Sequence, residues 1–193
     1  MVFKTATEAE RLTTRDFFST KDVFTVKKMT AMAVLLAARA ILGLPFLTIY
    51  IGGVRVFTLS HVADALCGML FGPIAGLVFG FAGDFLGFVA SQGAGGGYLP
   101  FYALSEMATC FLFALFLYKR EVTWPRVIIP SLLNLGAVFL GLNTIWFMML
   151  YGKDAMLGVL PFRIGLNAAM TPVYIIVIWF VLTRVSRIKF FRQ

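Results

Sequence analysis

Residues 59–91 read LSHVADALCGMLFGPIAGLVFGFAGDFLGFVAS, two apolar stretches that meet at Gly72-Pro73. Glycine followed by proline is a strong turn signal, so it separates two helical segments. The second segment, near 74–91, approaches the roughly 20 apolar residues that a helix needs to cross a bilayer core. The first segment, near 59–71, is short for a span of its own. This pattern is typical of an integral membrane protein.

The rest of the chain repeats this apolar character. The sequence is 60% hydrophobic and only 13% charged, whereas soluble domains carry about 25% charged residues. Its mean hydropathy is +0.90. We therefore predict an all-α integral membrane protein with six transmembrane helices. The four remaining segments are expected near 26–44, 98–118, 124–150 and 161–183.

Positive charges indicate how these helices are oriented. Of the 17 Lys and Arg residues, six precede residue 29, three lie at 119–126 where segment four ends and segment five begins, and four follow residue 183. Only Arg55 and Lys153 fall in loops on the opposite side. Cytoplasmic loops carry such an excess, so both termini are expected to be cytoplasmic. The expected organisation is a tail at 1–27, a six-helix membrane domain at 28–185 and a basic tail at 186–193. Anionic lipid explains the net charge of +8 without a nucleic-acid partner.

Several charged residues interrupt the apolar segments. A charge at the centre of a bilayer costs about 2.5–3.5 kcal/mol on insertion scales, so it is usually paired or faces a polar cavity. We expect Asp64 and Asp84 to form structural ion pairs with Arg39 or Arg163. Glu106 is a further charge of this kind. A small membrane protein with several such residues is expected to hold a polar ligand.

Small residues at intervals of four let helices approach closely. Ala33 and Ala37 form such a strip on the first segment, which fits internal packing and partner docking equally well. The spacings Gly72–Gly76–Gly80 and Gly83–Gly87 predict tight packing of segment two against segment three.

Polar and aromatic residues gather near the expected outer face. Cations suit a carboxylate, amides read donor and acceptor edges, and aromatic rings stack on a flat ligand. An ordinary interfacial belt is the alternative for the aromatic residues. Asn134 lies deeper and is expected to join helices. The candidate substrate-binding residues are Asn143, Trp146, Arg163, Tyr98, Asn167, Arg39, Lys153 and Tyr102.

The sequence argues against catalysis and against a metal or cofactor. It contains no GxxxxGK[ST], HExxH or GxSxG motif, so it has no nucleotide-binding loop of its own. His61 is the single histidine, and Ser60, His61 and Asp64 share one helical turn rather than forming a nucleophile, base and orienting group. The two cysteines lie in apolar segments and are expected to be core residues.

Several motifs occur together in one order along the chain. They are GMLFGP at 68–73, GDFLG at 83–87, LFLYKR at 115–120, LGLNTIW at 140–146, LYGK at 150–153 and LPFR at 160–163. This set resembles the substrate-binding (S) components of energy-coupling factor (ECF) vitamin transporters over about residues 28–185. The block at 140–153 resembles the folate branch in particular.

The resemblance implies a multi-pass protein of a prokaryotic cell membrane that captures folate from outside with high affinity. Its partners would be a transmembrane coupling subunit and two ATPase subunits, and the S component would topple to release its ligand inside. Ala33 and Ala37 would form the docking face, and loops 45–58 and 91–98 would act as gates. Asn143 would form hydrogen bonds with the pterin and Trp146 would stack on it, with Tyr98 on the opposite face of the ring. Arg163, Arg39 or Lys153 would take the carboxylate charge.

One stretch departs from this family pattern. Residues 55–61, RVFTLSH, lack the apolar Gly/Phe-rich character that the folate branch leads us to expect. Pantothenate or another small vitamin therefore remains an alternative ligand on the same architecture. A ligand-free membrane scaffold is the third hypothesis.

Overall fold

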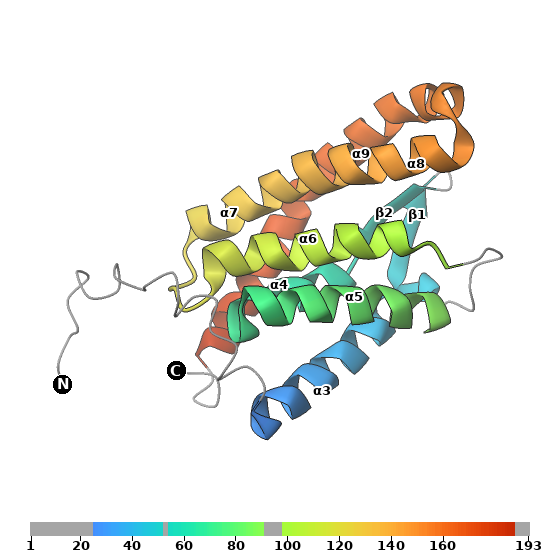
Figure 1. The fold of residues 1–193 in the computed structure, drawn as a ribbon. Coiled ribbons are helices and arrows are strands. Elements are labelled where there is room, and N and C mark those ends of the chain that lie inside the picture. The colour runs from blue at the N-terminus through green and yellow to red at the C-terminus, as the bar shows by residue number, and fades with distance from the viewer. Residues whose placement is uncertain (1–24, 52–53, 91–97, 188–193) are drawn as a thin grey trace, which may run out of the picture.

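The computed structural model describes residues 25–51, 54–90 and 98–187. Most of the expected N-terminal tail, the end of the basic tail and nearly all of the proposed gate at 91–98 lie outside the described residues. Helices occupy all six predicted apolar segments (Figure 1). The elements are α3 (Val26–Leu42), η1 (Pro45–Leu47), β1 (Thr48–Ile51), β2 (Val54–Thr58), α4 (Ser60–Phe71), α5 (Pro73–Ala90), α6 (Pro100–Leu117), α7 (Trp124–Leu133), the π-helix η3 (Asn134–Leu142), α8 (Asn143–Tyr151) and α9 (Lys153–Ser186).

Four described helices are long and apolar enough to cross a membrane. They are α5 and α6, of 18 residues each, the continuous Trp124–Tyr151 of 28 residues, and α9 of 34 residues. The helix α4 is apolar but has only 12 residues, as its short sequence segment predicted. The described chain is thus a helical protein with four candidate spans.

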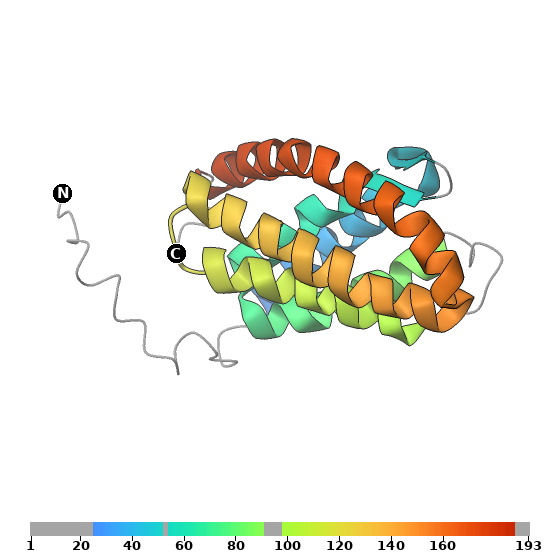
Figure 2. The ribbon, with the colours of Figure 1, turned by 90° about the horizontal axis from the view of Figure 1, so that it is seen from above.

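Proline and glycine set most helix boundaries. Pro73 opens α5, and α6 and α7 each carry proline in their first two positions, where its missing N–H has no intrahelical partner to lose. Gly152 separates α8 from α9 with a φ of 87°, a left-handed conformation that favours glycine. Figure 2 shows α7–α8 and α9 as two long antiparallel arms joined at one end of the bundle.

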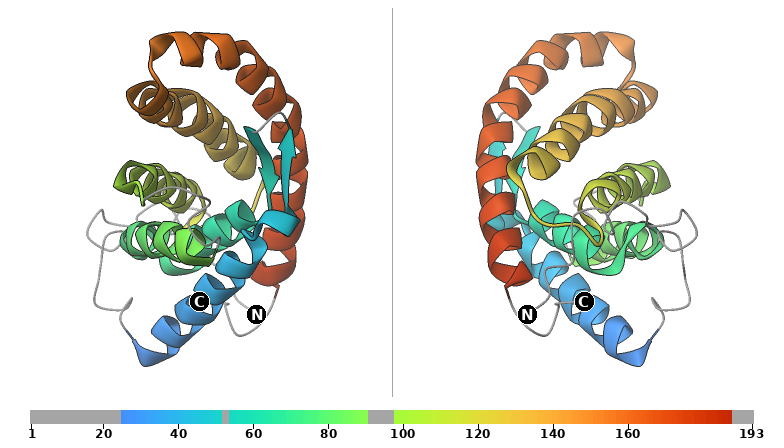
Figure 3. Two further views of the ribbon diagram at one scale, coloured as in Figure 1. Left: turned by 90° about the vertical axis from the view of Figure 1, so that its right-hand side faces the viewer. Right: turned by 90° about the vertical axis from the view of Figure 1, so that its left-hand side faces the viewer.

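The start of the last helix differs from the prediction. A start near 161 was expected, but α9 begins at Lys153 and contains Pro161 and Pro172 in its interior. Proline removes one backbone hydrogen bond, and membrane helices tolerate this where neighbouring groups satisfy the freed carbonyl. In the views along the bundle, α9 curves around one side (Figure 3).

The first loop is a hairpin, which the sequence pattern did not indicate. Strands β1 and β2 pair antiparallel from Thr48 opposite Thr58 to Ile51 opposite Val54, with an irregularity after Ile49. The hairpin lies against α9 (Figure 3). The backbone N–H of Thr58 donates to the hydroxyl of Tyr174 over 2.7 Å. The segment between α3 and α4 is therefore attached to the last helix.

The helix α6 lies centrally, between α5 and the α7–α8 arm (Figure 1). Glycines of segment three face its backbone. A Cβ on Gly80 would come within 2.7 Å of Met107 Cα, and one on Gly76 within 3.4 Å of the Cys110 carbonyl carbon. The helix α4 does contact α5, as expected, but these two glycines face α6 because their bare surfaces admit its backbone. A Cβ on Gly87 would have no described atom within 4 Å.

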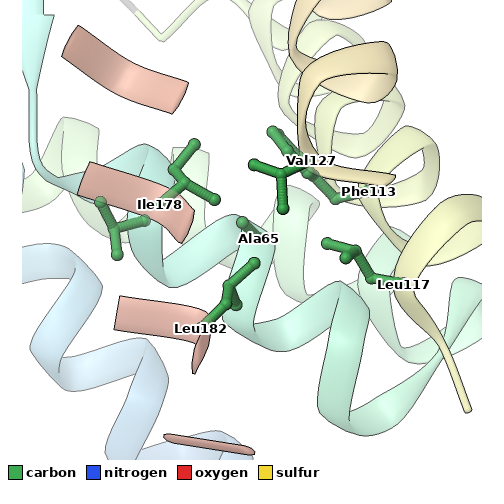
Figure 4. Close-up of a cluster of buried hydrophobic side chains, with 7 residues drawn as sticks. Ala65, Phe113, Leu117, Val127, Ile178 and Leu182 are labelled. Carbon is green, nitrogen blue, oxygen red and sulfur yellow. The ribbon is translucent and has the colours of Figure 1, made fainter. Parts of the chain in front are cut away.

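An apolar core at one end of the bundle joins four helices. Val62 and Ala65 of α4 lie among residues of α6, α7 and α9 (Figure 4). This core fixes the position of α4 and with it the polar residues at its N-terminal end. The side chains from the other three helices, all nearly inaccessible to solvent, are Phe113, Leu117, Val127, Ile178 and Leu182.

Candidate functional site

A buried ion cluster connects α3, α4 and α6. Arg39 Nε donates to Asp64 Oδ1 over 2.5 Å, and Arg39 Nη2 donates to Glu106 Oε2 over 2.9 Å. Arg39 and Asp64 are 5% and 0% exposed. The thiol of Cys110 lies 3.5 Å from the same Asp64 oxygen. The expected pairing of Arg39 with Asp64 is present, and the guanidinium is occupied by two carboxylates.

His61 completes this cluster on the side facing α9. Its Nδ1 lies 3.4 Å from Asp64 Oδ2. His61, Asp64 and Glu106 present candidate ligand atoms within 4.8 Å of one another, as a metal site would. The Arg39 guanidinium already donates to both carboxylates. It therefore supplies the positive charge that a metal ion would bring.

A pocket beside His61 holds about 380 Å³ of space between side chains, its open mouth included. It lies between α4, α6, α7, η3 and α9, which places it within the bundle. An apolar wall with a few placed polar groups is typical of small-molecule sites, and sites between the helices of a bundle are common. The polar lining residues are His61, Ser131, Asn134, Asn167, Thr171 and Tyr174, and Phe139 is among the apolar ones.

Two asparagines supply complementary polar groups to this pocket. Asn134 Oδ1 lies 2.9 Å from the donating hydroxyl of Thr109, and Asn167 Nδ2 donates to the Arg163 carbonyl over 2.8 Å. Among the described residues no other hydrogen bond occupies either amide. The Asn134 Nδ2 donor and the Asn167 Oδ1 acceptor are therefore available to a ligand.

The π-helix explains why one side of the pocket was missed. In a π-helix the backbone hydrogen bonds join residues five apart, and such segments often occur at functional sites. Asn134 and Phe139 are five apart in η3 and both line the pocket. A helical period of 3.6 places them on different faces. Asn134 was assigned to helix packing because it lies deeper than the other polar residues. His61 was considered for catalysis and for a metal site but not for ligand binding, although a lone histidine in an apolar segment was the available signal.

Of the predicted site residues, only Asn167 lines this pocket within the described part of the chain. Arg163 precedes Asn167 by one helical turn, and Asn143 follows Phe139 by four residues. Asn143 Oδ1 is buried, and no described residue gives it a hydrogen bond. Arg163 lies over the Phe147 ring, 5.3 Å from its centroid. Asn143 and Arg163 therefore lie next to the pocket, toward the α8–α9 turn.

The predicted aromatic residues lie on and beside the first part of α6. Trp146 Nε1 donates to Ser105 Oγ over 3.0 Å, and its ring stacks on Phe101 at 5.3 Å. Tyr98 precedes α6. Burial and the nearby Asp84 carboxylate raise the pKa of Tyr98 to about 12, so its phenol stays protonated and can donate a hydrogen bond.

The last predicted residues are placed differently. Tyr102 is half-buried on the first turn of α6, and Lys153 is exposed at the start of α9. Ala33 and Ala37 are exposed on α3, whereas Arg39 on the same helix points into the protein. The alanine strip is thus on the outer surface of the described chain, where a partner can reach it.

Candidate spanning helices around a largely apolar pocket with a few polar groups are typical of a multi-pass membrane protein. The family model described as "ECF transporter, substrate-specific component" matches residues 27–189. The chain belongs to this family of transporter components, which are not enzymes.

Two proteins similar to this chain carry a more specific description. A folate transporter, FolT, from Clostridium novyi (strain NT) is 30% identical over 130 residues, which are 67% of this chain and 74% of the relative. A crystal structure of FolT bound with folic acid superposes with a TM-score of 0.75 at 24% identity. The match covers 88% of this chain and 98% of that one, and it shows that the two share a fold.

Proposed function

We propose that this chain is the S component that captures folate for an ECF transporter. Its curated relative is named a folate transporter, and the similar crystal structure holds folic acid. The observation that carries the proposal is the pocket, where Asn134 and Asn167 each keep one amide atom free of hydrogen bonds from the described residues. A hydrogen bond contributes about 0.5–1.5 kcal/mol, so a polar ligand that pairs with both groups gains from each.

We place the pterin ring in the pocket and the glutamate end toward the α8–α9 turn. Arg163 is one turn from Asn167, and Lys153 lies exposed at the start of α9. These two cations, rather than the ion-paired Arg39, are the proposed partners of the ligand carboxylates. The part of the ligand between the ring and the glutamate would lie among Asn143, Trp146, Tyr98 and Tyr102.

The proposed topology has six spans and cytoplasmic termini. It rests on the excess of Lys and Arg at the ends of the sequence and after α6. The pocket would then receive its ligand from outside. Release inside would follow toppling of the whole subunit against a transmembrane coupling subunit that works with two ATPases. Ala33 and Ala37, exposed on α3, are the proposed contact with that coupling subunit.

Thermal unfolding of the detergent-purified chain tests the ligand. Folic acid at 100 times its dissociation constant should add about 2.7 kcal/mol of stability, whereas pantothenate at the same concentration should add none. If pantothenate alone stabilises the chain, pantothenate rather than folate is the ligand, and the proposed architecture is unaffected. A folded, ligand-free preparation that no vitamin stabilises would favour a scaffold subunit and overturn the proposal.

A further inference from the structure

His61 is a buried polar residue at the edge of the pocket. The residue is 4% exposed, and neither Nδ1 nor Nε2 forms a hydrogen bond with the described residues. Its ring lies edge-on to Phe139 at 5.3 Å and to Tyr174 at 5.6 Å. An imidazole held between two aromatic rings has a defined orientation but no polar contact toward the pocket. A ligand would supply that contact.

The neighbouring carboxylate determines which imidazole nitrogen is the acceptor. Asp64 Oδ2, which can only accept when ionised, lies 3.4 Å from Nδ1. This proximity favours the tautomer with its proton on Nδ1, as a carboxylate does for many functional histidines. Nε2 is then an acceptor. Asp64 is itself held in place by its hydrogen bond from Arg39, so the ion cluster fixes the carboxylate that orients His61.

We propose that His61 Nε2 anchors the ligand by accepting a hydrogen bond from a ring N–H or amino group. This inference rests on the proposed function and assigns the ring-binding end of its site. The pocket then presents two acceptors, His61 Nε2 and Asn167 Oδ1, and one donor, Asn134 Nδ2. That pattern fits a flat nitrogen heterocycle with N–H or amino groups beside a ring carbonyl, such as a pterin.

His61 belongs to the stretch that departs from the folate-like pattern of the sequence. The proposed contact therefore uses a position at which this chain differs from that pattern. The other polar groups around the ring are Asp64 and, through it, Arg39 from α3, with Glu106 from α6 and Tyr174 from α9. Arg39 donates to both carboxylates, and of these residues only His61 and Tyr174 line the pocket.

The test compares two ligands across matched variants of the full-length purified chain. Dissociation constants for folic acid and for pterin, which lacks the glutamate, are measured with wild type, His61→Phe and Arg163→Gln. His61→Phe should weaken both ligands by at least about fivefold, the lower limit for one buried hydrogen bond. Arg163→Gln should weaken folic acid and leave pterin unchanged. Ser186→Ala is the control, since this hydroxyl lies outside the pocket and donates to the Thr183 carbonyl over 3.0 Å.

A second pair of variants covers the case in which His61→Phe does not fold. The amide of Gln reaches the position of Nε2, whereas that of Asn reaches the position of Nδ1. His61→Gln should therefore bind pterin more tightly than His61→Asn. Equal pterin binding by these two variants, or wild-type binding by a folded His61→Phe, would overturn the inference and leave the folate proposal standing. A wild-type chain that binds neither ligand would instead overturn the proposed function.

Discussion

The guanidinium of Arg39 lies directly against the backbone of Gly83. A Cβ at position 83 would come within 2.7 Å of Arg39 Nε, Cζ and Nη1. The absent side chain of Gly83 on α5 thus makes room for a charge on α3 that pairs with α4 and α6. The glycine spacing that suggested helix packing also serves to bury an arginine.

Gly83→Ala should destabilise the protein, although alanine is the better helix former. The guanidinium cannot move away without leaving its two carboxylates, so we expect a loss of about 1–3 kcal/mol from overpacking. Gly87→Ala is the matched control, because no described atom lies within 4 Å of the added Cβ. It should be neutral or stabilise the helix by up to about 1 kcal/mol. Thermal unfolding in detergent measures both, and equal behaviour would contradict this role of Gly83.

Arg39→Met should lower the stability of the protein more than Gly83→Ala does. It leaves Asp64 and Glu106 buried without a counter-charge, and breaking a buried pair in this way costs about 3–5 kcal/mol. Adding Asp64→Asn should recover part of the loss, since one uncompensated carboxylate is removed. Arg126→Met is the control, because Arg126 is only partly buried and donates to the backbone carbonyl of Glu121. A double variant no more stable than Arg39→Met in chemical unfolding would show that the loss does not come from an uncompensated Asp64 carboxylate.

Asn143→Ala should separate ligand binding from stability. The buried Asn143 Oδ1 has no hydrogen bond to lose among the described residues of the ligand-free protein, so the unfolding temperature should stay the same or rise. Folic acid binding should weaken by about 1–3 kcal/mol if Asn143 contacts the ligand. Calorimetric titration of Asn143→Ala and Arg163→Ala decides the assignment. If both variants bind folic acid as wild type does, neither residue belongs to the site.

Large residues on the alanine strip should block transport and spare binding. Ala33→Trp and Ala37→Trp each add bulk to the exposed surface of α3, where close helix approach requires small residues. We expect vitamin uptake by cells expressing the whole transporter to be lost, with unchanged folic acid affinity of the purified chain. Ala33→Ser is the control and should retain uptake. If uptake survives in both tryptophan variants, Ala33 and Ala37 do not form the docking surface.

The proposed ligand site was only partly predictable. Arg163 and Asn167 were identified because polar residues stand out in an apolar segment, and Asn167 does line the pocket. His61 and Asn134 were missed because their roles depend on distant partners. His61 is positioned at the pocket by its contacts with Tyr174 of α9 and Phe139 of η3. Asn134 faces the pocket because it lies in a π-helix, which no local signal in the sequence indicated.

The sequence by itself determined where the helices lie. Long apolar segments must form internal hydrogen bonds in a membrane, and Gly72-Pro73 and Gly152 interrupt them through local backbone preferences. It also determined that Arg39 must be paired, because an isolated charge is too costly in hydrocarbon. The tertiary structure alone decided which partners Arg39 takes. Asp64 and Glu106 lie 25 and 67 residues away, and only helix packing brings such distant groups together.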